Sequence, residues 1–107
     1  MSRVRFVRIL VFFDLPTKTA QDRRNYRHFR KFLIQNGFVM MQESVYSKLV
    51  PNRGAGNTVK QAVRAAAPTS GRIMLTDMTE EQYARIDYLN GQEDSEYLIS
   101  AERFVVL

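Results

Sequence analysis

One stretch of the chain decides the fold, and it lies at residues 9–33: ILVFFDLPTKTAQDRRNYRHFRKFL. It opens with an uninterrupted apolar run and continues, beyond Asp14 and Pro16, into a segment with apolar residues at helical spacing. The apolar run predicts a strand over about residues 4–13 that enters the middle of a sheet. Asp14 would then stand where this strand leaves the sheet.

A helix should follow the strand over about residues 20–36. Thr19 and Asp22 have the spacing of a capping box at its start, and Gly37 is the stop signal. At 100° per residue, one side of this helix collects the side chains that we expect to pack: Asp22, Tyr26, Phe29, Phe32 and Leu33. Ile34 falls on the other side, and the pattern does not place it.

The other side of this helix is strongly basic. Residues 18–31 include only one acid, and their cations are Lys18, Arg23, Arg24, Arg27, Arg30 and Lys31. No acid lies four residues away to pair with these arginines, so their mutual repulsion costs stability. A polyanionic ligand would relieve that repulsion, and we expect this surface to bind nucleic acid.

The rest of the chain supplies the remaining core elements. Residues 38–42 and 44–50 predict two short strands, or one strand bent by a bulge near Glu43. PNRGAGN, residues 51–57, predicts a loop ending at an Asn57 N-cap. A helix is expected next, over residues 58–67, with its inward side formed by Val59, Ala62, Val63 and Ala66. A strand over residues 72–78 should follow it. TEEQ then opens a last helix that runs to about residue 88.

This βαββαβ order predicts an α+β fold, a ferredoxin-like sandwich of an antiparallel sheet with two helices on one face. We expect a single domain with a core at residues 1–78 and a C-terminal part, 79–107, made of a helix, an acidic loop and a terminal strand. The apolar end of the chain, FVVL at residues 104–107, needs a sheet edge. This extra C-terminal strand could pair with the edge of its own sheet or with that of a second subunit. We favour a homodimer that exchanges it, which also suits so short a chain.

Charge and composition limit the classes of partner that this chain could bind. Residues 1–72 carry 14 Lys/Arg and 3 acids, net +11, whereas residues 73–107 carry 2 and 8, net −6. The basic part favours phosphate backbones as partners. The longest apolar run is too short to cross a bilayer, and the absence of cysteine fits a reducing compartment, so we expect a cytoplasmic protein with no membrane partner and no targeting peptide.

Asp14 is the candidate for chemistry. An acid there can ligate a hard cation, but one carboxylate does not make a Mg²⁺ site, so from spacing alone we favour a helix-facing or turn-forming Asp before LP. A two-fold axis near the strand end would bring two copies of Asp14 together, and a divalent cation between them could serve phosphodiester cleavage. His28 lies beside the basic surface with no nearby acid to orient it, and we assign it no catalytic role.

Several motifs together resemble one family. VFFDLP, the basic helix closed by Gly37 and Phe38, MQESVYSK, and GRIMLTDMTEEQY are similar to the second CRISPR-associated protein family, the small subunit of the spacer-acquisition complex. The resemblance runs from about residue 8 to 107 and is nearest to members that accompany type II systems. Many relatives carry Tyr before the Asp, where this chain has Phe13.

The resemblance implies a ferredoxin-like homodimer with an exchanged C-terminal strand and Asp14 facing its two-fold mate at a Mg²⁺ site, as catalytic and metal-binding residue of an endonuclease of RNA or DNA. It also implies assembly between two dimers of the CRISPR integrase subunit, with the basic surface holding double-stranded prespacer DNA. Scaffolding is our first interpretation, and metal-dependent cleavage is the second. A third is an RNA-binding module of the RRM type, which lacks support because SVYSKLV has no aromatic pair for stacking bases.

Overall fold

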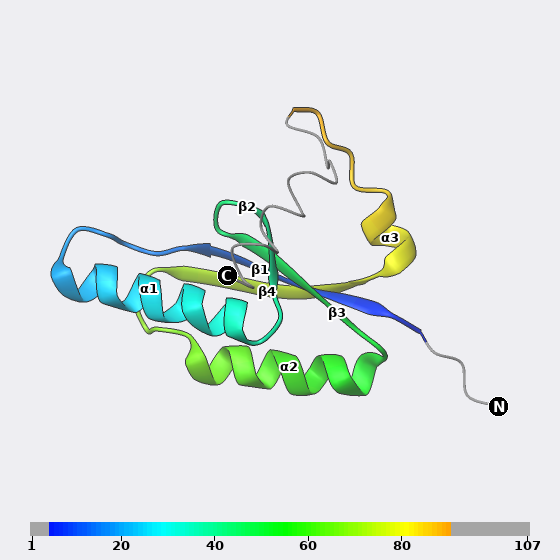
Figure 1. Ribbon diagram of the computed structural model, residues 1–107, viewed down its shortest axis with the longest axis horizontal. Helices are drawn as coiled ribbons and strands as arrows, with labels where there is room; N and C mark the ends of the chain where they lie inside the picture. Colours follow the sequence, from blue (N-terminus) through cyan, green and yellow to red (C-terminus); the bar gives the residue numbers. More distant parts are fainter. Residues whose placement is uncertain (1–4, 91–107) are drawn as a thin grey trace.

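The computed structural model describes residues 5–90 of the 107-residue chain (Figure 1). Its elements follow in the order β1 (Val7–Asp14), α1 (Ala20–Gln35), β2 (Val39–Gln42), β3 (Val45–Val50), α2 (Arg53–Ala66), β4 (Arg72–Thr79) and α3 (Glu80–Ala84). The predicted βαββαβ order is therefore confirmed, with a short third helix after it. The exchanged terminal strand was predicted for residues that lie outside the described range.

The four strands form one sheet in the order β2-β3-β1-β4, and every neighbouring pair is antiparallel. Helices α1 and α2 lie side by side on one face, and α3 lies on the opposite side (Figure 1). This arrangement confirms the α+β, ferredoxin-like fold. Strand β1 lies between β3 and β4, in the interior of the sheet, as its continuous apolar sequence predicted.

Alternation along β1 divides its side chains between the two faces of the sheet. Val7, Ile9, Val11 and Phe13 point toward the helices and belong to one buried cluster. The cluster also contains residues from the two long helices and from β3, namely Phe29, Leu33, Val63, Tyr46 and Val50. This apolar layer joins α1 and α2 to the sheet and is the core of the described part.

Phe13 is the aromatic centre of that layer. Its ring lies 5.3 Å from Phe29 and 5.9 Å from Tyr26 in edge-to-face geometry, and it stacks on Tyr46 at 5.7 Å. Such pairs add to the free energy gained from burial alone. Because Phe13 points into the core, the next residue, Asp14, points to the other side of the sheet.

The start of α1 agrees with its sequence signal. The Thr19 side chain accepts a hydrogen bond from the Asp22 backbone N–H, and the Asp22 carboxylate accepts one from the Thr19 N–H. The helix ends at Gln35, one residue earlier than predicted, and Gly37 follows with φ of +87°. Ile34, which the helical pattern did not place, is half-buried and packs against the core cluster.

The β2–β3 segment is a hairpin of two strands, which decides between the two predicted alternatives. Residues 43–44 form the turn, and Ser44 has φ of +66°. The ladder is irregular between Met40 and Gln42, so a bulge exists there rather than at Glu43.

The start of α2 corrects the sequence analysis. The helix begins at Arg53 and its N-cap is Asn52, whose side chain accepts from the Ala55 N–H at 2.8 Å. Residues 53–57 are therefore helical, not loop, and Asn57 is not the cap. Gly56 is buried, and a Cβ there would lie 3.1 Å from Ile9, so this glycine lets the helix approach the sheet.

Three smaller expectations were also wrong. Ala62 is exposed, since it lies at the margin of the apolar side on which Val63 is buried. Helix α3 ends at Ala84 rather than near residue 88, although its predicted cap, Thr79 with Gln82, is present. Strand β1 begins at Val7 rather than at residue 4 within the part that the structure describes. No helix of that part is long and apolar enough to span a membrane.

Candidate nucleic-acid interface and the Asp14 site

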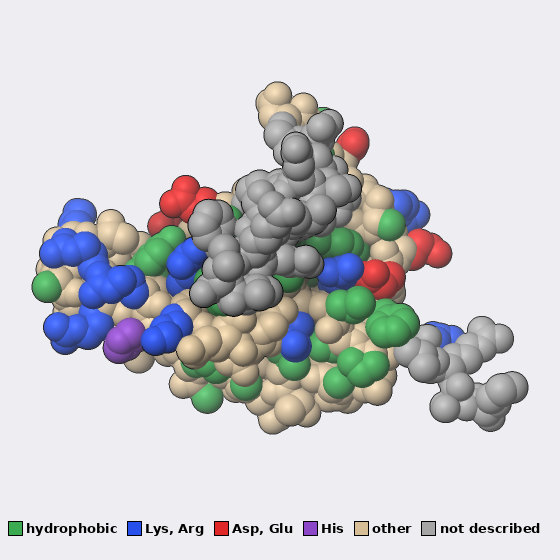
Figure 2. Space-filling model, in the orientation of Figure 1, with side chains coloured by type: hydrophobic (Ala, Val, Ile, Leu, Met, Phe, Trp, Pro, Cys, Tyr) green, Lys and Arg blue, Asp and Glu red, His purple; other side chains and the backbone are tan. Residues whose placement is uncertain are grey.

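The basic surface predicted for α1 is present. We define it by the six cations of residues 18–31, all of which are exposed: Lys18, Arg23, Arg24, Arg27, Arg30 and Lys31. Figure 2 shows Lys and Arg side chains gathered at one end of the molecule, over the region of α1 and beside the single histidine. Core packing uses the opposite side of the same helix, which leaves this side to solvent.

These cations form few hydrogen bonds with the described part of the chain. Arg23 donates to the backbone carbonyls of Thr17 and Lys18 at 3.2 and 3.0 Å, and Arg24 donates to the Gln21 side chain at 3.2 Å. Within residues 5–90, no member of the basic surface forms an ion pair. Asp22, the acid in this segment, is engaged in the helix cap. The positive charge is therefore not neutralised by the described fold.

The cations of α2 contribute less than their number suggests. Lys60 pairs with Asp77 of β4 at 2.5 Å, and Arg53 lies 4.0 Å from the same carboxylate. Lys60 is largely buried in this contact, with 19% of its side chain exposed, so it serves to attach α2 to the sheet. Arg64 is exposed on α2. The sequence alone did not settle the faces of these residues.

Asp14 lies at the end of β1, exposed, on the face of the sheet opposite α1 and α2, which we call the second face. Its backbone is packed against Gly71, the residue before β4: Gly71 has φ of +80°, and a Cβ there would come within 2.8 Å of the Asp14 carbonyl oxygen and of the Leu15 side chain. Only glycine allows this close approach of the two backbones. The two strand ends therefore set where the Asp14 carboxylate projects.

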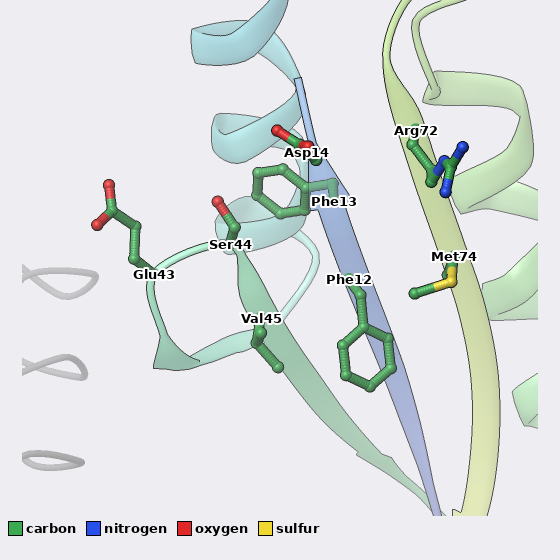
Figure 3. A pocket seen from close by; sticks show the side chains of 8 residues that line it. All are labelled: Phe12, Phe13, Asp14, Glu43, Ser44, Val45, Arg72 and Met74. Carbon is green, nitrogen blue, oxygen red and sulfur yellow. The ribbon is translucent and has the colours of Figure 1, made fainter. Parts of the chain in front are cut away.

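A shallow pocket of about 260 Å³ opens beside Asp14 (Figure 3). Its lining comes from β1, the β2–β3 turn, β3 and β4: Phe12, Phe13, Asp14, Glu43, Ser44, Val45, Arg72 and Met74. Most of this lining is apolar, and the charged groups are Asp14, Glu43 and Arg72. In Figure 3 the Glu43 carboxylate extends away from the other two.

The donor set of one chain does not fit a magnesium site. Mg²⁺ requires octahedral oxygen ligands, usually including more than one carboxylate or a substrate phosphate. Residues 5–90 contain no group of three or more His, Asp or Glu side chains that could hold a metal ion. The neighbour of Asp14 across the ladder is a cation, Arg72. A metal at Asp14 would need ligands from elsewhere.

The structure keeps the two predicted sites apart. The basic surface belongs to the helix layer, Asp14 belongs to the second face, and none of the six cations lines the Asp14 pocket. Arg72 is the residue that sequence reasoning left unassigned, because only the β1–β4 register puts it opposite Asp14.

Comparison with known proteins gives a consistent result. The family model described as CRISPR associated protein Cas2 matches residues 7–86. A protein of Treponema denticola named CRISPR-associated endoribonuclease Cas2 is 44% identical over 101 residues, covering 94% of this chain and 100% of its own. Proteins of the same name from Streptococcus mutans and Ligilactobacillus salivarius are 45% and 36% identical, each over 94% of this chain and over 93% and 100% of their own lengths. Since these matches span the βαββαβ core and the Asp14 strand, the chain belongs to the CRISPR-associated Cas2 family.

Proposed function

We propose that this chain is a scaffold subunit of CRISPR spacer acquisition, which works as a homodimer and holds double-stranded prespacer DNA on the basic surface of α1. The observation that supports this most directly is the exposure of six cations on one short segment with no acidic partner among residues 5–90. DNA phosphates would neutralise these charges, and release of condensed counterions would drive binding.

Such a surface contacts the DNA backbone rather than the bases. Guanidinium and ammonium groups on an exposed helix pair with phosphate oxygens, which carry no sequence information. A protein that must accept DNA fragments of any sequence needs this kind of contact. The integrase subunit would catalyse the reaction, and this chain would hold the DNA and set the distance between the integrase dimers.

The second face supports the homodimer. Leu49 and Met74 expose 42% and 57% of their surface, and the ladders pair Leu49 with Arg8 and Met74 with Phe12 on this face. An apolar sheet face of this kind is stabilised by a partner that covers it. In an isologous dimer the same face of a second copy is that partner.

The test is the salt dependence of duplex binding, measured by fluorescence anisotropy with the full chain. If the dimer contacts about 6–10 phosphates, affinity should fall roughly 10³–10⁵-fold between 50 and 200 mM salt. Arg27→Glu should weaken binding and reduce the slope, with about one unit lost per phosphate contact. Arg85→Glu, which reverses one exposed charge beside α3, is the matched control and should change binding much less. A flat salt dependence, or equal effects of the two variants, would contradict the proposal.

A second candidate function is metal-dependent endonuclease activity, favoured by the name of the relatives, CRISPR-associated endoribonuclease Cas2, and by the exposure of Asp14 beside a pocket. In this candidate Asp14 is the catalytic residue, and it would hold Mg²⁺ together with the partner subunit's Asp14. One carboxylate per subunit is a sparse set for turnover, so we rank this second. Asp14→Asn should abolish Mg²⁺-stimulated RNA or DNA cleavage if the candidate is right. The scaffold function predicts that this variant still supports spacer integration.

A further inference from the structure

Asp14 and Arg72 are directly opposite each other on adjacent strands, yet they do not neutralise each other. The β1–β4 ladder pairs their Cα atoms, and both side chains are exposed. In the described part of the chain neither takes part in an ion pair. Figure 3 shows the Asp14 carboxylate and the Arg72 guanidinium pointing away from each other. Each subunit therefore presents one free anion and one free cation at the same end of the second face.

These charges stand at the edge of apolar surface. Phe12 and Met74 are the next pair down the same face of the ladder, and Val45 of β3 lies beside them in the pocket lining. Covering this surface removes water from the charged groups too. A charge moved out of water without a partner is strongly unfavourable, so a cover that left Asp14 facing only another carboxylate would be disfavoured.

We infer that in the homodimer Arg72 of each subunit pairs with the partner subunit's Asp14, so that four charges of alternating sign surround the two-fold axis. This inference rests on the proposed homodimer and deepens it. An isologous interface must be self-complementary, and one carboxylate beside one guanidinium is the smallest set of charges that meets this requirement.

The strand register shows how such a dimer is built. When a two-fold axis runs parallel to the strands between β1 and β4, β1 of one sheet lies over β4 of the other. The ladder pairs Asp14 with Arg72 and Phe12 with Met74, so the same axis places Asp14 over the partner's Arg72 and Phe12 over the partner's Met74. Charge meets opposite charge, and apolar surface meets apolar surface, in a single arrangement.

A consequence separates this arrangement from a metal-bridged one. Arg72 supplies the positive charge that two neighbouring carboxylates would otherwise take from a divalent cation. The wild-type dimer should therefore persist in chelator. It should also weaken as salt is raised, to the extent that the charge pairs remain accessible to solvent.

The decisive experiment uses two full-length variants, Asp14→Arg and Arg72→Asp. The first carries two cations at this end of the second face and the second carries two anions, so neither can form an attractive pair within its own chain or with its own copy. Each variant alone should dimerise at least about tenfold more weakly than the wild type. Mixed together, they should form the heterodimer in preference to either homodimer, measured by native mass spectrometry with a mass tag on one variant.

Matched controls are Asp87→Arg and Arg64→Asp, which reverse exposed charges outside the pocket. Their mixture should show only the statistical proportion of heterodimer, and circular dichroism of all four variants tests whether each one is folded. A folded mixture of Asp14→Arg and Arg72→Asp with no preference for the heterodimer would overturn the inference while the wild-type dimer stands. A wild-type protein that stays monomeric at all concentrations would overturn the proposed homodimer itself.

Discussion

The guanidinium of Arg8 lies over the ring of Tyr83, with its central carbon 4.2 Å from the ring centroid. The same side chain donates from Nε to Glu80 at 2.6 Å, so β1 is joined to α3 by a stacked ring and an ion pair at once. Arg8 is on the second face, and it attaches α3 to the side of the sheet that α1 and α2 leave uncovered. This contact fixes the point from which the chain continues beyond α3.

Replacing Arg8 should therefore loosen α3 without unfolding the core. Arg8→Ala should lower the free energy of unfolding by about 1 kcal/mol, a value that allows for the partial exposure of the pair. Urea denaturation measures the change. Arg5→Ala removes an exposed arginine three residues earlier and should be nearly neutral. Equal losses for the two variants would show that the contact contributes nothing.

Gly71→Ala tests how firmly the strand ends are packed at Asp14. The new Cβ would meet the Asp14 backbone at 2.8 Å in a left-handed conformation, so we expect a loss of about 2–3 kcal/mol in unfolding free energy. Gly37→Ala is the control. Its φ is also positive, but its Cβ would meet the movable end of Lys48, so it should cost only about 1 kcal/mol. Thermal melting of both variants would show whether the backbone clash matters.

Two asparagines distinguish the observed start of α2 from the one that its sequence suggested. Asn52→Ala removes the side chain that accepts the Ala55 N–H and should cost about 0.5–2 kcal/mol of stability. Asn57→Ala places a better helix former in an exposed helical position and should be neutral or slightly stabilising. The reverse order of effects would mean that the helix starts where the sequence analysis placed it.

The integrase contact can be tested by truncation. From the sequence we expect it at the acidic segment of residues 92–103 and the terminal strand, which lie outside the described residues. A chain ending at Asn90 should fail to retain the integrase subunit in a pull-down, because the acidic segment would be gone. Duplex binding by the truncated protein should be measured in parallel, since it reports whether the basic surface is still presented. Full retention of the integrase would move the interface to residues 1–90.

The sequence predicts best where a local signal has a single physical meaning. Thr19 with Asp22 and Thr79 with Gln82 are both caps in the structure, because the side chain and backbone that form each cap are only three residues apart. The basic surface was also predictable, since residues that alternate with core positions on one helix are forced outward.

Prediction failed where the conformation or role of a residue depends on a part of the fold that is distant in sequence. Gly54 and Gly56 suggested a loop, yet both are helical; at Gly56 a glycine is favoured because a Cβ would lie only 3.1 Å from the Ile9 side chain. Arg72 was a cation that the sequence left unassigned, and only its register with Asp14 across β4 and β1 gives it a specific place. Neither relation is visible within a short window of sequence.

The sharing of Asp77 between Lys60 and Arg53 has one more consequence. With those cations drawn toward β4, α1 carries five of the six exposed cations of the basic surface, and its 16 residues extend about 24 Å. At about 3.4 Å per base pair, that helix can follow only about seven base pairs of a duplex. If duplex DNA binds along this helix as proposed, a longer fragment would need more than one copy, and the number of copies along the DNA would set the length of the fragment that they hold.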